Sequence, residues 1–310
     1  MGTATKPVGR DEFDLDLMCQ LSISSRADPA DVKRIVGERL RAHGTYRGML
    51  REKNRCWRLV YAGEFHMDII PGIPDPGART GTALLVPDKE LRCWKETDPK
   101  GYGAWFLARA EVAAVTGEAV RAEVEPAPAP SDERRKLALQ VVVQLLKRHR
   151  DLMFVDDEDA PISIIITTLA AHAYDGSQSV VGALSGVLAR MPDYIVRTTT
   201  GVAHVGNPVN PLENFADKWS THPRRERCFF DWLARARRDL EGLRIAGLAN
   251  MPDALGGWVG ERAATRAIRD YAQDMRRRRD IGIGVSAATG MLGSTSPGAA
   301  QSPDHTFFGR

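Results

Sequence analysis

Residues 12–17 read Glu-Phe-Asp-Leu-Asp-Leu, and this stretch decides how the rest of the chain is interpreted. Apolar and acidic residues alternate, which is typical of a half-buried β-strand, so the side chains of Asp14 and Asp16 share one face. Two carboxylates held this close repel each other unless a cation lies between them. The pattern indicates either a divalent-metal site or a strand with a solvated acidic face.

A third acidic residue follows on another predicted strand. Residues 56–61 and 65–70 alternate and are separated by a turn at Gly63, which predicts a β-hairpin. Asp68 lies in its second strand on the same face as His66, where it is either a satisfied structural residue or a site residue. Combined with the Asp14 strand and a helix that begins at Asp28-Pro29, it matches the polymerase-β-like nucleotidyltransferase pattern, in which three carboxylates hold two Mg²⁺ ions about 3.5–4 Å apart.

The composition is that of an ordinary globular protein. The 310 residues are 43% apolar and 27% charged, with a net charge of +3, which does not indicate a dedicated nucleic-acid binder. The four cysteines form no C-x-x-C pair, and no apolar run approaches the roughly 20 residues of a membrane span. We therefore expect a cytoplasmic protein with free thiols, no membrane partner and no secretory signal.

The second half of the chain is predicted to be helical. Residues 125–130 (Glu-Pro-Ala-Pro-Ala-Pro) are expected to form a stiff linker between lobes, followed by helices over 132–150, 161–174, 221–242 and 253–279. Residues 206–215 read as a dense turn segment. This predicts an α+β protein: a catalytic core over 1–125, a helical lobe over 126–281 and a disordered Gly/Ser/Ala/Pro tail over 282–310.

The basic helix ends each have two interpretations. Lys147 and its neighbours are either an electrostatic cap of the helix C-terminus or ligands of a nucleotide triphosphate. Residues 276–279 (Arg-Arg-Arg-Arg) indicate a solvated helix end or a surface for RNA or an acidic partner.

Five segments together resemble the bacterial CD-NTases, relatives of animal cyclic GMP-AMP synthase and oligoadenylate synthase. They are residues 6–17, 65–71, 144–150, 161–170 and 207–219, and they occur in the family's order. The resemblance implies a two-lobed nucleotidyltransferase with a mixed sheet, which makes cyclic di- or trinucleotide second messengers, sometimes linear ones, from NTPs in CBASS anti-phage defence.

The resemblance also implies roles for individual residues. Asp14, Asp16 and Asp68 match the metal-binding acids, with two Mg²⁺ ions (or Mn²⁺) as cofactor and Asp68 assisting deprotonation of the attacking hydroxyl. Lys147 and Ser163 match positions that contact the donor triphosphate. ATP is expected among the substrates, regulatory protein partners are compatible with the family, and nucleic acid is not required.

The chain departs from the family pattern at its start. Family members carry a Gly-Ser phosphate-binding loop, preceded by an N-terminal helix, before the acidic strand. Here Gly2-Thr3 is either a degenerate form of that loop or lies just after it, so we expect an N-terminally truncated chain. This departure makes a truncated nucleotide-binding protein without catalytic activity one alternative, while the basic residues 276–279 favour another, a nucleotidyltransferase that acts on RNA or protein.

Overall fold

The computed structural model describes Thr3 and residues 13–23, 27–61, 65–78, 80–90, 92–117, 136–280, 283–285 and 292–294. Contacts divide the chain into two compact units, Met1–Ile245 and Ala246–Arg310. The predicted linker at 125–130 lies outside the described residues.

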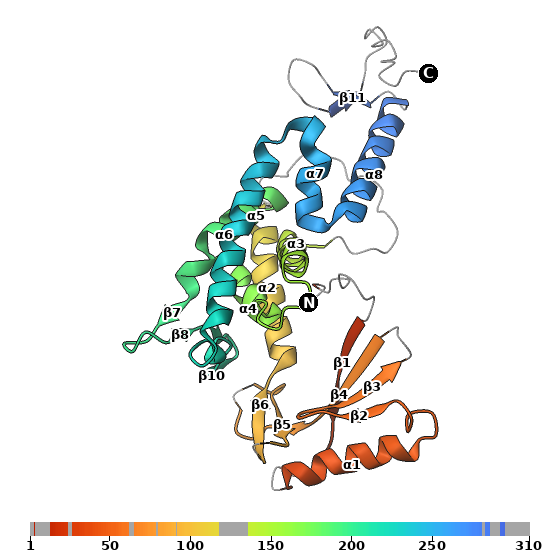
Figure 1. Ribbon diagram of the computed structural model, residues 1–310, viewed down its shortest axis with the longest axis vertical. Helices are drawn as coiled ribbons and strands as arrows, with labels where there is room; N and C mark the ends of the chain where they lie inside the picture. Colours follow the sequence, from red (N-terminus) through yellow and green to blue (C-terminus); the bar gives the residue numbers. More distant parts are fainter. Residues whose placement is uncertain are drawn as a thin grey trace. The chain divides into compact units, whose positions relative to one another are not determined.

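The first unit begins with a mixed six-stranded sheet whose central strand is β4 (Figure 1). Strand β4 pairs in parallel with β1 on one side and antiparallel with β3 on the other, while its last residues pair with β5. The predicted hairpin is therefore confirmed as β3 and β4, and the mixed sheet agrees with the predicted fold class. The strands are β1 Phe13–Gln20, β2 Leu50–Glu52, β3 Trp57–Tyr61, β4 Phe65–Pro74, β5 Leu84–Asp88 and β6 Cys93–Thr97.

Helix α1 (Pro29–Ala42) covers one face of this sheet (Figure 1). It begins where the Asp28 side chain accepts a hydrogen bond from the Ala30 N–H, with Pro in the first turn. Its buried Val36 packs in one cluster with Trp57, Leu59 and Ile69 from β3 and β4. The apolar residues of β3 and β4 thus face α1, which leaves the other face for the acidic positions, while Leu15 and Leu17 of β1 remain half exposed.

The rest of the first unit is a helical lobe. It consists of α2 (Pro99–Gly117), α3 (Ala138–Met153), α4 (Ser163–Ala173), α5 (Val180–Arg190), the 3₁₀ turn η2 (Met191–Tyr194) and α6 (Pro223–Ile245). Helix α4 is the centre of this lobe, since it is buried on almost every side and contacts α2, α3 and α5. Its last carbonyl groups accept hydrogen bonds from Arg109 of α2 and Arg190 of α5, which satisfies a buried helix end.

The segment between η2 and α6 forms two short strand pairs rather than the predicted turns alone. Strand β7 (Val196–Arg197) pairs with β8 (Ala203–His204), and β9 (Gly206–Asn207) pairs with β10 (Asn210–Asn214). The 3₁₀ turn η3 (Asp217–Trp219) then leads to α6. Pro and Asn residues turn the chain in this segment, and the two strand pairs fix its backbone at the surface of the lobe.

The second unit contains α7 (Gly247–Val259), α8 (Glu261–Asp280) and the strands β11 (Ile283–Val285) and β12 (Leu292–Ser294). The prediction of one helix over 253–279 was wrong, because Gly260 adopts a φ of 87° that ends α7. In the tail that was expected to be disordered, β11 and β12 pair antiparallel. Within the described parts of the chain, no helix combines the length and apolar character needed to cross a bilayer.

Candidate active site

The parallel pairing of β1 with β4 brings the three predicted acidic positions to one face of the sheet. Asp16 lies directly opposite Asp68 in the register, and Asp14 lies opposite His66. Paired residues of a parallel ladder project from the same face, and so do residues two apart on one strand. The backbone alone therefore places Asp14, Asp16 and Asp68 together, on the face opposite to α1.

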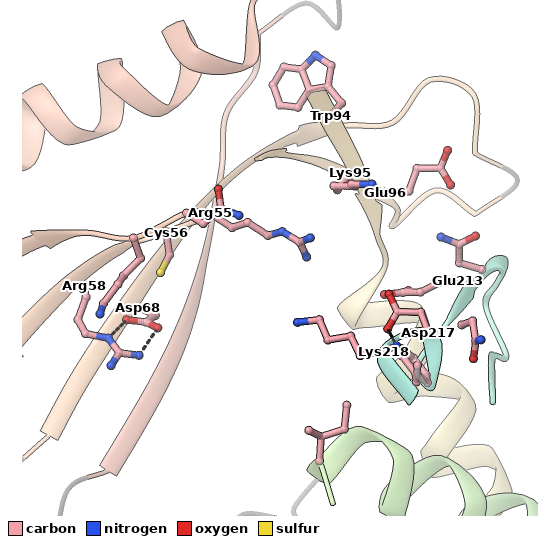
Figure 2. Close-up of a pocket in the computed structure, with 16 residues that line it drawn as sticks. Arg55, Cys56, Arg58, Asp68, Trp94, Lys95, Glu96, Glu213, Asp217 and Lys218 are labelled. Atoms are coloured by element: carbon pink, nitrogen blue, oxygen red, sulfur yellow. Dashed lines mark hydrogen bonds and ion pairs between the residues drawn. The ribbon is translucent and has the colours of Figure 1, made fainter. Parts of the chain in front are cut away.

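Asp68 is held by an arginine from the neighbouring strand. Arg58 of β3 is its antiparallel partner, and its Nε and Nη2 donate to the two carboxylate oxygens at 2.7 Å each (Figure 2). This guanidinium holds the pKa of the Asp68 carboxyl below its ordinary value. The pair is a bidentate, charge-assisted contact of the stronger kind.

Cys56 is a second neighbour of Asp68. Cys56 lines the cavity together with Asp68, and burial, together with the Asp68 charge, raises the pKa of the Cys56 thiol to about 11. The thiol therefore stays protonated at neutral pH and can donate to Asp68.

The acidic face suits a hard divalent cation. Carboxylate oxygens are the donors that Mg²⁺ prefers, and the register supplies three of them on adjacent strands. Among the side chains that the structure describes, which do not include that of Asp14, no three His, Cys, Asp or Glu residues form a ready metal cluster. The donor set fits the ions, while the Asp68 carboxylate is engaged by Arg58.

Asp68 and Arg58 line a cavity of about 990 Å³, at the upper end of the roughly 300–1,000 Å³ typical of small-molecule sites. Its wall carries both signs of charge. The cations are Lys53, Arg55, Arg58, Lys95 and Lys218, and the acids are Asp68, Glu96, Glu213 and Asp217. Excess positive charge and aromatic walls from Trp94 and Phe215 suit an anionic ligand with a planar ring.

The far wall of the cavity comes from β10 and η3, where Glu213, Asp217 and Lys218 lie across from Asp68 (Figure 2). Asn214 braces this wall from inside: its side chain accepts from the N–H groups of Val205 and Ala216 and donates to the Ala203 carbonyl. Glu213 accepts a hydrogen bond from the Asn207 side chain at 2.8 Å. Asn207 and Asn214 therefore help to fix the shape of the wall.

Comparison with known proteins identifies the family. The chain is 31% identical to a c-di-GMP synthase of Roseivirga ehrenbergii over 318 residues, which cover 100% of this chain and 83% of that protein. The chain belongs to the bacterial CD-NTases. It is therefore a nucleotidyltransferase of a family that makes nucleotide second messengers, and residues 1–109 match the model of the Second Messenger Oligonucleotide or Dinucleotide Synthetase domain.

Other CD-NTases agree with this assignment. The cyclic dinucleotide synthase CdnG of Bradyrhizobium diazoefficiens is 25% identical over 96% of this chain and 79% of its own length. Its structure in complex with GTP matches with a TM-score of 0.63 and 20% identity, covering 84% and 79% of the two chains. The Vibrio cholerae DncV structure with nonhydrolyzable GTP matches with a TM-score of 0.60, 15% identity and coverage of 83% and 65%. These structures confirm the polymerase-β-like fold.

In this CD-NTase, the two predicted triphosphate ligands make contacts of their own. Lys147 of α3 donates from Nζ to the Thr3 carbonyl at 3.0 Å, and burial, with Arg150 nearby, lowers its pKa. Ser163, in the first turn of α4, accepts from Arg150 at 3.1 Å. Neither residue lines the 990 Å³ cavity, although Ile162, beside Ser163, does.

Sequence reasoning missed the basic residues of the cavity. Arg58 could have been found by extending the predicted hairpin, since the pairing of Tyr61 with Phe65 fixes Arg58 opposite Asp68. Lys53 and Arg55 follow β2, Lys95 lies in the middle of β6, and Lys218 lies in η3, and only tertiary folding brings these segments together.

Proposed function

We propose that this CD-NTase joins two GTP molecules into a cyclic dinucleotide, c-di-GMP. The observation that carries the proposal is the register that sets Asp16 opposite Asp68, with Asp14 on the same face. Asp68 also lines the cavity of about 990 Å³. The choice of guanine rests on the relative named as a c-di-GMP synthase. ATP, expected from the sequence, is the alternative second substrate.

In this proposal Asp14, Asp16 and Asp68 hold two Mg²⁺ ions. When bound, such ions neutralise charge on the transferring phosphate and lower the pKa of the attacking hydroxyl. The protein supplies position and charge: Lys53, Arg55 and Lys95 attract the anionic triphosphate into the cavity. The aromatic ring of Trp94 offers a surface for a base.

The test is a turnover assay with each NTP, alone and in pairs, in Mg²⁺ or Mn²⁺. We expect c-di-GMP by mass spectrometry from GTP alone, and a loss of about 10³-fold in Asp16→Asn, since the lost charge stabilisation is worth several kcal/mol. Asp31→Asn, an exposed residue of α1, is the matched control and should keep full activity. Nucleotide appearing on RNA or protein instead would replace this proposal with the alternative acceptor.

Lys147 and Ser163 are proposed to contact the donor triphosphate, as their match to the family implies. A triphosphate would offer the half-buried Lys147 ammonium a stronger partner than the Thr3 carbonyl does. We expect Lys147→Met to raise the KM for GTP about tenfold, with Lys136→Met as control because Lys136 contacts only Gln144 among its described hydrogen bonds. If steady-state kinetics show the same KM for GTP in Lys147→Met as in the wild type, Lys147 does not contact the triphosphate.

We further propose that the product acts in cytoplasmic anti-phage signalling, which the family resemblance supports. Expression of the gene with its neighbours should lower phage plating efficiency, and Asp16→Asn should restore it. Equal plating of both strains would separate the enzyme from defence.

A further inference from the structure

We propose that Arg58 couples the binding of divalent cation and nucleotide, because it competes with the cation for Asp68. This inference rests on the proposed function, in which Asp68 is a metal ligand. Arg58 would then be a positioning residue that acts through Asp68 and determines when the acidic site can accept an ion.

The contact geometry supports competition. Arg58 meets Asp68 with a planar fork, and each carboxylate oxygen accepts one bond at 2.7 Å. Asp68 lies between Arg58 on β3 and Asp16 on β1 in the register, so both oxygens of the carboxylate that would join Asp16 in holding an ion already accept from Arg58. A divalent cation that bound there would need the same oxygens, and it would be repelled by the guanidinium at contact distance.

The surroundings allow Arg58 to leave. Its side chain is 26% exposed and that of Asp68 is 17% exposed, and both line the large cavity. The cross-strand register fixes the backbone of both residues, so a change of partner requires only side-chain rotation. The pair is thus accessible to ligands that enter the cavity.

Phosphate is the natural competitor for Arg58. Guanidinium binds phosphate oxygens with the same bidentate fork that it offers to a carboxylate. A triphosphate in the cavity can therefore withdraw Arg58 and free Asp68 for a cation. By linkage, each ligand then raises the affinity for the other by the same factor.

The first test measures Mn²⁺ binding to nucleotide-free protein by electron paramagnetic resonance. Arg58→Met should bind Mn²⁺ about tenfold more tightly than the wild type, because a charge-assisted pair no longer competes. Arg51→Met is the matched control: Arg51 is the cross-strand neighbour of Arg58 on β2 and donates to the Gly48 and Leu50 carbonyls. It removes the same charge without touching Asp68, so its Mn²⁺ affinity should stay near the wild-type value.

The second test measures coupling from the nucleotide side. The probe is the α,β-methylene analogue of GTP, which cannot transfer its α-phosphoryl group, titrated calorimetrically with and without saturating Mn²⁺. Mn²⁺ should tighten analogue binding by a larger factor in the wild type than in Arg58→Met. Arg58→Lys keeps the positive charge but loses the planar fork of the guanidinium. The factor by which Mn²⁺ tightens analogue binding to this variant should lie between the wild-type and Arg58→Met values.

The Mn²⁺ affinities of two variants distinguish a failure of the coupling from a failure of the proposed metal site. If Asp68→Asn abolishes Mn²⁺ binding while Arg58→Met binds Mn²⁺ no more tightly than the wild type, the coupling is refuted and the metal site stands. If Asp68→Asn leaves Mn²⁺ binding unchanged, the proposed metal site fails and the coupling fails with it.

Discussion

Tyr102 of α2 and Thr168 of α4 form a hydrogen bond between the side chains of the two helices. Their hydroxyl oxygens lie 2.7 Å apart, and Thr168 is fully buried. Burial raises the pKa of Tyr102 to about 12, so the phenol stays neutral at any physiological pH. The pair is therefore a neutral hydrogen bond inside the core.

Removing one partner of this bond should cost more than removing both. Tyr102→Phe leaves a buried hydroxyl unsatisfied, and we expect the free energy of unfolding to fall by about 1–3 kcal/mol in urea titrations. The double variant Tyr102→Phe/Thr168→Val should recover part of that loss. Tyr271→Phe, 63% exposed in α8, is the control with an expected change near zero. Additive losses in the cycle would contradict the bond.

Helix α1 lies so close to β3 that its packing depends on one glycine. A Cβ atom built on Gly37 would lie 2.2 Å from the Trp57 ring, far inside van der Waals contact. Gly37→Ala should therefore destabilise the protein by about 1–3 kcal/mol through overpacking. Gly44→Ala, where no atom lies within 4 Å, should be neutral or stabilising in the same urea titrations. Equal stability of the two variants would mean that α1 moves away at little cost.

Helices α3 and α6 meet at His149, which is 2% exposed and lies 3.1 Å from Asp239. Burial lowers the pKa of His149, and this effect outweighs the attraction of the Asp239 carboxylate, which would raise it. For Asp239, burial would raise the pKa, but the hydrogen bonds from Arg235 and His149 lower it below its ordinary value. The folded state therefore disfavours the protonated imidazole. Its contribution to stability is present above the unfolded pKa of about 6.5 and is lost as the pH falls below it.

The lowered pKa of His149 predicts how the stability of the helical lobe changes with pH. Between pH 7.5 and 5.5, the Tm of the wild type should fall more than that of His149→Gln, which keeps a polar side chain but does not titrate. Circular dichroism melts at both pH values measure the difference. A wild-type Tm that rises on acidification would mean that the Asp239 ion pair outweighs burial.

The helices and strands that depend on local sequence periodicity could be predicted from the sequence. The acidic strand, the hairpin and helices α1 and α4 follow from alternation, capping and apolar stripes. Helix α5 was missed, because Val180, Val181 and two glycines are poor helix formers, although Ser179 caps it by accepting from the Gly182 N–H. The cations around Asp68 could not be predicted, since they meet only through strand pairing and the packing of distant segments.

Nucleotide binding should raise the thermal stability of the whole molecule. Ligands that bind only the folded state stabilise it by about 2.7 kcal/mol at 100 times Kd, which corresponds to a Tm rise of about 5–10 °C for a unit of this size. We expect GTP with Mn²⁺ to produce this shift in differential scanning fluorimetry, and CTP with Mn²⁺ to produce less. The Asp16→Asn variant should lose most of the GTP shift. Equal shifts with both nucleotides would argue against guanine selection.

The parallel pairing of β1 with β4 also has a consequence for how the protein is made. Phe13 pairs with Phe65, so the strands that carry the acids are about 50 residues apart in the chain, and contacts of such long range slow folding. During synthesis β1 emerges first and has no partner until α1, β3 and β4 have followed it. Asp16 thus meets Asp68 only after β4 has been made, and until then the unpaired β1 exposes Leu15, Leu17 and its backbone groups, which favour aggregation.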